Sequence, residues 1–84
     1  ALALAPHGIR VNAVCPGEVR TPMLQSQRSE PVTPALLDHI AAIVPMGRLV
    51  EPIEIARVVA FLASDAASYM TGALVSVDAG YGAR

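Results

Sequence analysis

The chain has no lysine, a single cysteine and no long apolar run, and each shortage excludes a class of protein. All six basic side chains are arginines and the net charge is -1, so no basic stripe is available to neutralise nucleic-acid phosphates. Cys15 cannot form an internal disulfide, and its apolar surroundings predict a small buried thiol. No apolar stretch approaches the length of a membrane span, and the first residues lack the basic flank of a signal peptide. We therefore expect neither nucleic acid nor membrane as a partner.

The composition is too apolar for a domain of this length. A globule of 84 residues buries only about 60 to 65% of its unfolded surface, yet 54% of these residues are hydrophobic and 15% are charged. The helix-forming run Ala1 to Ala5 has no capping residue before it, so the chain is expected to open inside a helix that Pro6 and Gly8 close. These features predict a domain that is incomplete by itself.

A short strand and the turn after it stand out in the first quarter of the chain. Residues 9–15 are rich in Val and Ile and lie between Gly8 and Pro16-Gly17, which predicts a strand that ends abruptly. Thr21-Pro22 then has the form of a helix start. In an open α/β sheet, the carboxyl edge that the chain leaves here is where ligands bind.

The rest of the chain returns to the same sheet. Residues 22–44 predict a pair of helices, the second beginning at Thr33-Pro34, and residues 52–64 predict the strongest helix. Residues 73–77 predict a second strand, so strand, helix and strand imply a parallel crossover. Both strands are expected to be buried on two faces, which requires further elements to cover them.

The helix over 52–64 has two distinct faces. Helical spacing puts one apolar group toward the sheet: Ile55, Val58, Val59 and Leu62. Phe61 falls instead on the polar arc with Glu54 and Asp65. An aromatic residue there suggests contact with a partner subunit, although single exposed apolar side chains are also ordinary.

Four ordered motifs together resemble the C-terminal portion of the short-chain dehydrogenase/reductase family. The stretch Gly8 to Gly17, with Val19 and Thr21-Pro22-Met23 after it, is similar to the sixth strand of that family and the loop that follows. The later motifs are Pro45-Met46-Gly47-Arg48, Glu51-Pro52-Ile53-Glu54-Ile55-Ala56, Phe61-Leu62-Ala63-Ser64-Asp65 with Tyr69-Met70-Thr71-Gly72, and Val77-Asp78-Ala79-Gly80. The resemblance covers essentially the whole chain.

The resemblance implies an α/β fold, namely the C-terminal part of a Rossmann-type doubly wound parallel sheet. It also implies a hydride transfer between NAD or NADP and a small alcohol or carbonyl substrate. Members of the family are usually cytoplasmic homo-oligomers, dimers or tetramers. An alternative function is a non-catalytic structural or oligomerisation protein of the same fold.

By the same resemblance, four residues form the nicotinamide side of the site. Pro16 and Gly17 would lie beside the ring, the Val19 backbone would pair with its carboxamide, and Thr21 would reach the carboxamide or the pyrophosphate. Thr21 has a plainer role as a helix cap, and the two roles are compatible. Residues 22–44 would form a substrate lid, or else a packed helical hairpin without a gating role. The lid candidates are Met23, Leu24, Leu36, Leu37 and Ile40.

The catalytic pair of the family is absent from this chain. Family members use a tyrosine followed four residues later by a lysine, whose charge lowers the phenol pKa. Because the chain has no lysine, Tyr69 and Tyr81 are interpreted as structural, and no catalytic or metal-binding residue is predicted. Ala79 stands where the family usually has glycine, which argues against a left-handed turn there.

Overall fold

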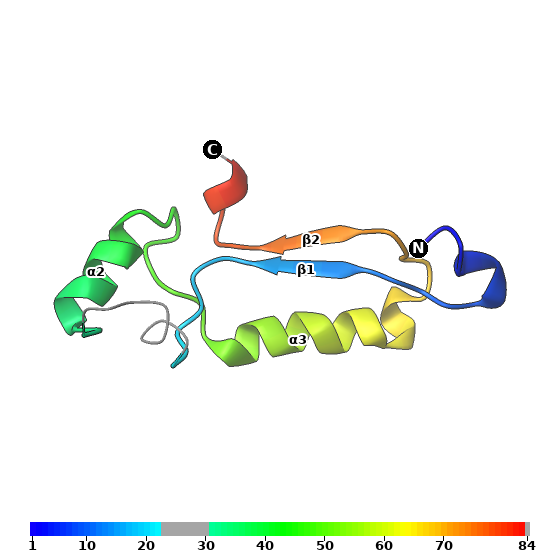
Figure 1. Cartoon of the computed structure of the whole chain (residues 1–84), viewed down its shortest axis with the longest axis horizontal. Helices are drawn as coiled ribbons and strands as arrows, with labels where there is room; N and C mark the ends of the chain where they lie inside the picture. The colour runs from blue at the N-terminus through cyan, green and yellow to red at the C-terminus, as the bar shows by residue number, and fades with distance from the viewer. Residues whose placement is uncertain (23–30, 84) are drawn as a thin grey trace.

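The computed structural model describes residues 1–22 and 31–83, and these form a small parallel α/β unit (Figure 1). Strands β1 (Ala13–Pro16) and β2 (Leu74–Val77) pair in parallel. Helix α3 (Pro52–Ala63) lies along one face of the sheet, and α2 (Pro34–Ala42) lies beyond the carboxyl ends of the strands. Three single 3-10 turns complete the order: η1 (Ala5–His7), η2 (Asp65–Ala67) and η3 (Tyr81–Ala83). The expected partial Rossmann-type architecture is therefore confirmed.

The two strands are shorter than the sequence predicts. Ala13 pairs with Leu74 and Pro16 with Val77, so β1 begins four residues after the expected start at Ile9 and ends one residue later. Before β1, the C=O of Val11 accepts from the backbone N–H of Gly72 at 2.7 Å, and side chains supply further bonds. The amide of Asn12 donates to the C=O of Met70 at 3.0 Å, and its Oδ1 accepts from the N–H of Ala73 at 3.0 Å. These bonds fix the start of both strands side by side.

Helix α3 starts where its sequence predicts and packs on β1. Glu51 is the N-cap, and its side chain and that of Glu54 form a reciprocal capping box ahead of Pro52. Leu62 is buried, but Val59 of the expected inner face is 49% exposed, because the sheet beneath has two strands among residues 1–22 and 31–83. Phe61 is 46% exposed, as its position on the polar arc predicts.

Two further expectations about burial and local structure are wrong. The opening residues form a turn and η1 rather than the end of an α-helix, although Gly8 does close the segment in the left-handed conformation with φ 74°. Cys15 is exposed rather than buried. The physical reason is that, within residues 1–22 and 31–83, α3 packs against one face of the sheet and leaves the thiol face uncovered. Neither strand is covered on both faces by the described residues, so the expectation that further elements cover them stays a prediction. Across the same ranges, no helix combines the length and apolar character needed to cross a bilayer.

Candidate functional site

The turn after β1, at Gly17, lies in close contact with the turn after β2, at Asp78. The N–H of Gly17 donates to the C=O of Val77 at 3.1 Å, which extends the ladder one step past Pro16. A Cβ atom at Gly17 would lie 3.1 Å from the Cα of Asp78. That distance is shorter than ordinary carbon contacts, so the absence of a side chain at position 17 allows the two turns to touch.

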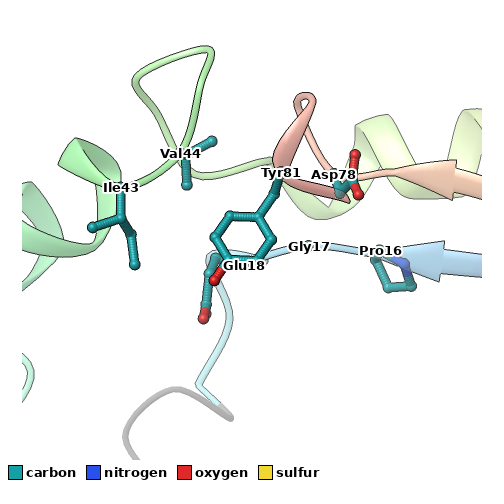
Figure 2. Close-up of a pocket in the computed structure, with 7 residues that line it drawn as sticks. All are labelled: Pro16, Gly17, Glu18, Ile43, Val44, Asp78 and Tyr81. Atoms are coloured by element: carbon teal, nitrogen blue, oxygen red, sulfur yellow. The ribbon is translucent and has the colours of Figure 1, made fainter. Parts of the chain in front are cut away.

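These turns form one side of an open groove of about 320 Å³ at the carboxyl edge of the sheet (Figure 2). Ile43 and Val44, which directly follow α2, form the other side, and Figure 2 shows the ring of Tyr81 projecting into the space between the two sides. The lining residues are Pro16, Gly17, Glu18, Ile43, Val44, Asp78 and Tyr81. The groove therefore combines three segments that are far apart in the sequence, in the place where α/β sheets bind ligands.

The turn after β2 fixes the position of Tyr81. The Oδ1 of Asp78 accepts from the N–H of Gly80 at 3.2 Å, and its Oδ2 accepts from the N–H of Gly82 at 2.9 Å. Ala79 has φ 56°, so the expectation that alanine argues against a left-handed turn here is wrong. The Asp78 hydrogen bonds hold the turn in a conformation that disfavours any residue with a Cβ.

Beyond Gly17 the chain runs beside the segment that leads into α3. Val19 and Val50 form an isolated parallel bridge, in which the N–H of Val50 donates to the C=O of Glu18 at 3.0 Å. The N–H of Arg20 donates to the C=O of Val50 at 2.9 Å. In this pattern Val50 uses both of its backbone groups, whereas those of Val19 point to the opposite edge. No partner for the Val19 N–H or C=O occurs among residues 1–22 and 31–83.

An ion pair between Arg48 and Glu54 lies next to Val50, at the start of α3. The guanidinium of Arg48 donates to both carboxylate oxygens of Glu54, Nη1 to Oε1 at 2.7 Å and Nη2 to Oε2 at 2.9 Å. The side-chain bonds from Arg48, together with the N–H of Glu51, lower the pKa of Glu54 to about 2. Glu54 raises the pKa of Arg48 in turn. Glu51 also lies 3.8 Å from the guanidinium of Arg20.

The predicted site residues fall into three groups. Pro16 and Gly17 line the groove, and Val19 and Thr21 follow on the same segment, both half-buried. Of the lid candidates, Leu36 and Leu37 are half-buried and Ile40 is buried on α2, and none of the three lines the groove. Met23 and Leu24 lie outside the described residues. The helix that Thr21 would cap lies in the same undescribed part, so its capping role stays a prediction.

Sequence reasoning missed several residues that line the groove. Ile43 and Val44 continue the helical apolar spacing of α2. That spacing could have indicated that both residues belong to the groove. No pattern indicates that Asp78 and Tyr81 join them, because the turn after β2 meets Gly17 only in three dimensions. Leu49 and Val50 are too short an apolar pair to predict the bridge to Val19.

The groove has features of a binding surface. It offers an apolar wall from Ile43 and Val44 and the phenol of Tyr81. The backbone edge of Val19, whose N–H and C=O have no partner among the described residues, follows on the segment that leaves the groove. Across the described ranges, no group of three His, Cys, Asp or Glu residues is placed to hold a metal ion. The arrangement is suited to orienting a planar ligand that carries an amide, since such a ligand needs one donor and one acceptor at a fixed separation.

Comparison with known proteins identifies the family. The model of the enoyl-(acyl carrier protein) reductase family matches residues 1–82. The oxidoreductase UcpA of Escherichia coli is 48% identical over 83 residues, an alignment that covers 95% of this chain and 32% of the relative. The short-chain dehydrogenase anuF of Penicillium roqueforti is 50% identical over 80 residues, covering 95% of this chain and 28% of the relative.

Solved structures agree with the sequence relatives. A short chain dehydrogenase family protein from Francisella tularensis superimposes with a TM-score of 0.88 at 37% identity, covering all of this chain and 37% of that one. A variant of actinorhodin polyketide ketoreductase, solved with NADPH, gives a TM-score of 0.86 at 44% identity, covering 99% of this chain and 34% of that one. The chain spans about a third of the length of these proteins and belongs to the short-chain dehydrogenase/reductase family.

Proposed function

We propose that this chain forms the nicotinamide-binding side of an NAD- or NADP-dependent oxidoreductase. The cofactor, when bound, exchanges a hydride with the carbon of a small alcohol or carbonyl substrate. In this proposal the chain binds and orients the nicotinamide and covers the substrate, and it performs no proton transfer itself. The name of the ketoreductase solved with NADPH supports a nicotinamide cofactor for a relative of the same fold.

The observation that carries the proposal is that the Val19 N–H and C=O have no partner among residues 1–22 and 31–83. A carboxamide has an N–H donor and a C=O acceptor on the same carbon, and the Val19 backbone offers the complementary pair on one edge. Each such bond contributes about 0.5–1.5 kcal/mol, and two together fix the rotation of the ring. Val19 is therefore the proposed carboxamide contact, with the Thr21 hydroxyl beside it on the carboxamide or pyrophosphate.

The remaining candidates complete the surface around the ring. Pro16 and Gly17 would lie against the ring, because both residues line the groove. Residues 22–44 would form the lid over the substrate, on which five side chains are proposed to give an apolar cover. These are Met23, Leu24, Leu36, Leu37 and Ile40.

The acid and base groups must come from outside these residues. With no lysine, the chain cannot supply the tyrosine and lysine pair that the family uses, so we place that pair in the rest of the full-length protein. Phe61, half-exposed on the outer face of α3, suits contact with a second subunit. We propose a cytoplasmic homo-oligomer, dimer or tetramer, as the working form.

The test uses the full-length protein and separates the backbone of Val19 from its side chain. We expect Val19→Pro, which removes the N–H but no bond of the Val50 bridge, to weaken NADH or NADPH binding about tenfold, as loss of one well-placed hydrogen bond does. Val19→Ala keeps the backbone groups and should bind within about twofold of the unchanged protein. Fluorescence titration of the reduced dinucleotide measures both. Failure of the unchanged protein to bind either dinucleotide would overturn the proposal.

A further inference from the structure

The Arg48–Glu54 pair is a bidentate surface ion pair with two short hydrogen bonds. The two N–H···O distances are 2.7 and 2.9 Å, and Nη1 of Arg48 also donates to the C=O of Leu49 at 3.2 Å. The side chains remain 54% and 32% exposed. Exposed pairs add little to the stability of a fold, but bidentate geometry restricts the direction of the groups it joins. The pair is therefore better suited to orientation than to overall stability.

Two sets of hydrogen bonds connect this pair to Val19. Glu54 lies in the first turn of α3 and also accepts from the N–H of Glu51 at 3.1 Å, so residues 48–51 are held against the start of the helix. Val50, in the middle of that segment, forms both hydrogen bonds of the bridge to Glu18 and Arg20. The free edge of Val19 is directly opposite that bridge.

We propose that Arg48 and Glu54 are positioning residues for the nicotinamide half of the cofactor. This inference rests on the proposed role of Val19. The pair touches neither cofactor nor substrate, and it acts by holding residues 48–51 so that the bridge presents the Val19 N–H and C=O at a fixed angle. A displacement of about 0.5 Å at such a contact is enough to lose a productive hydrogen-bond geometry. The adenosine half of the cofactor does not depend on this pair.

The experiment compares two ligands in the full-length protein. ADP-ribose has the adenosine and pyrophosphate of the cofactor but no nicotinamide, so it does not reach Val19. We expect Glu54→Gln to weaken NADH or NADPH binding about tenfold while ADP-ribose binding stays within about twofold. Arg48→Lys keeps the charge but loses the bidentate geometry, and it should weaken dinucleotide binding by a smaller factor. Should Glu54→Gln fail to fold, Arg48→Lys alone gives the same comparison between ligands.

Two controls show whether the loss of affinity comes from the orientation of residues 48–51, from the change in charge or from a change in folding. Asp65→Asn removes an exposed carboxylate just past the other end of α3 and should change neither affinity. The exchanged pair, Arg48→Glu with Glu54→Arg, restores a bidentate contact and should recover part of the lost dinucleotide affinity.

Each outcome decides the inference. An equal loss of affinity for ADP-ribose and dinucleotide would show that the pair supports the fold as a whole, and unchanged dinucleotide binding in both single variants would show no positioning role. Either result overturns this inference while leaving the proposed function in place. Absence of dinucleotide binding in the unchanged protein overturns both.

Discussion

At the scale of single residues, the contact between Gly17 and Asp78 determines the shape of the groove. The turn after β1 and the turn after β2 touch only because position 17 has no side chain, and Asp78 cannot retreat while its carboxylate holds the N–H groups of Gly80 and Gly82. The sequence indicates a strand end at Pro16-Gly17. It does not indicate which residue Gly17 touches, because Asp78 lies 61 positions later in the chain.

Gly17→Ala should move these two turns apart. The added Cβ would lie 3.1 Å from the Cα of Asp78, so we expect a loss of about 1–3 kcal/mol in the free energy of unfolding and weaker dinucleotide binding in the full-length protein. Gly8→Ala is the matched control. Gly8 has φ 74° and open space around it, so its substitution should lower stability without changing dinucleotide affinity. Equal effects of the two variants on affinity would contradict this account. Chemical denaturation and ligand titration measure the two quantities.

The Glu54 carboxyl should remain ionised at unusually low pH. Arg48 and the N–H of Glu51 lower its pKa from 4.5 to about 2. Since the folded-state pKa lies below the unfolded one, the stability from this pair is complete above about pH 4.5 and is lost as the pH falls toward 2. Carbon NMR of the labelled carboxyl in the full-length protein should find Glu54 still ionised at about pH 3.5. In Arg48→Met, the same carboxyl should titrate closer to 4.5. An unchanged titration in that variant would show that Arg48 is not the cause.

At the scale of elements, local signals predict the helices better than the strands. Thr33-Pro34 marks the start of α2 and Pro52 the start of α3, because a capping side chain and a proline act within one turn of their own position. The start of β1 is misplaced by four residues, since pairing depends on where β2 begins. The left-handed conformation of Ala79 was missed although its cause is local, because the adjacent Asp78 carboxylate accepts from the N–H groups of Gly80 and Gly82.

Thr33→Ala should loosen the first turn of α2. The Thr33 hydroxyl accepts from the N–H of Leu36 at 3.2 Å, and loss of such a cap lowers helix stability by about 1 kcal/mol. We expect the Leu36 and Leu37 amides of the full-length protein to exchange with solvent about fivefold faster. Thr33→Ser preserves the cap and should exchange at the original rate. Equal exchange in the alanine and serine variants would refute the capping role. Hydrogen exchange followed by NMR or mass spectrometry gives these rates.

At the scale of the whole molecule, the described residues extend over 49 × 26 × 20 Å with a very small core. The buried apolar residues among them are Ile40, Val44, Leu62 and Ala67. Large side chains such as Leu74, Ile53 and Phe61 are exposed, and the sheet has two strands. The composition predicts this excess of exposed apolar side chains over buried ones, because the apolar fraction exceeds what 84 residues can bury. The exposure of Cys15 differs from the predicted buried thiol, because α3 packs on one face of the sheet among the described residues.

The isolated 84 residues should therefore neither bind a dinucleotide tightly nor turn over an alcohol. Two parallel strands and one packed helix leave the sheet edges unpaired, and the chain has no lysine for the acid and base chemistry. Purified chain can be assayed for NAD(P)H production against a blank, with circular dichroism to follow its folding. Turnover above the blank would contradict the assignment of catalysis to the rest of the protein. The full-length protein is the positive control.

The most direct measurement of the central claim is a crystal structure of the full-length protein with its nicotinamide dinucleotide. We expect the Val19 N–H and C=O both to bond to the carboxamide, with donor to acceptor distances of about 2.7–3.2 Å, while the bridge between Val19 and Val50 remains intact. A nicotinamide ring bound away from Gly17 and Val19, or a carboxamide held by other residues, would contradict it.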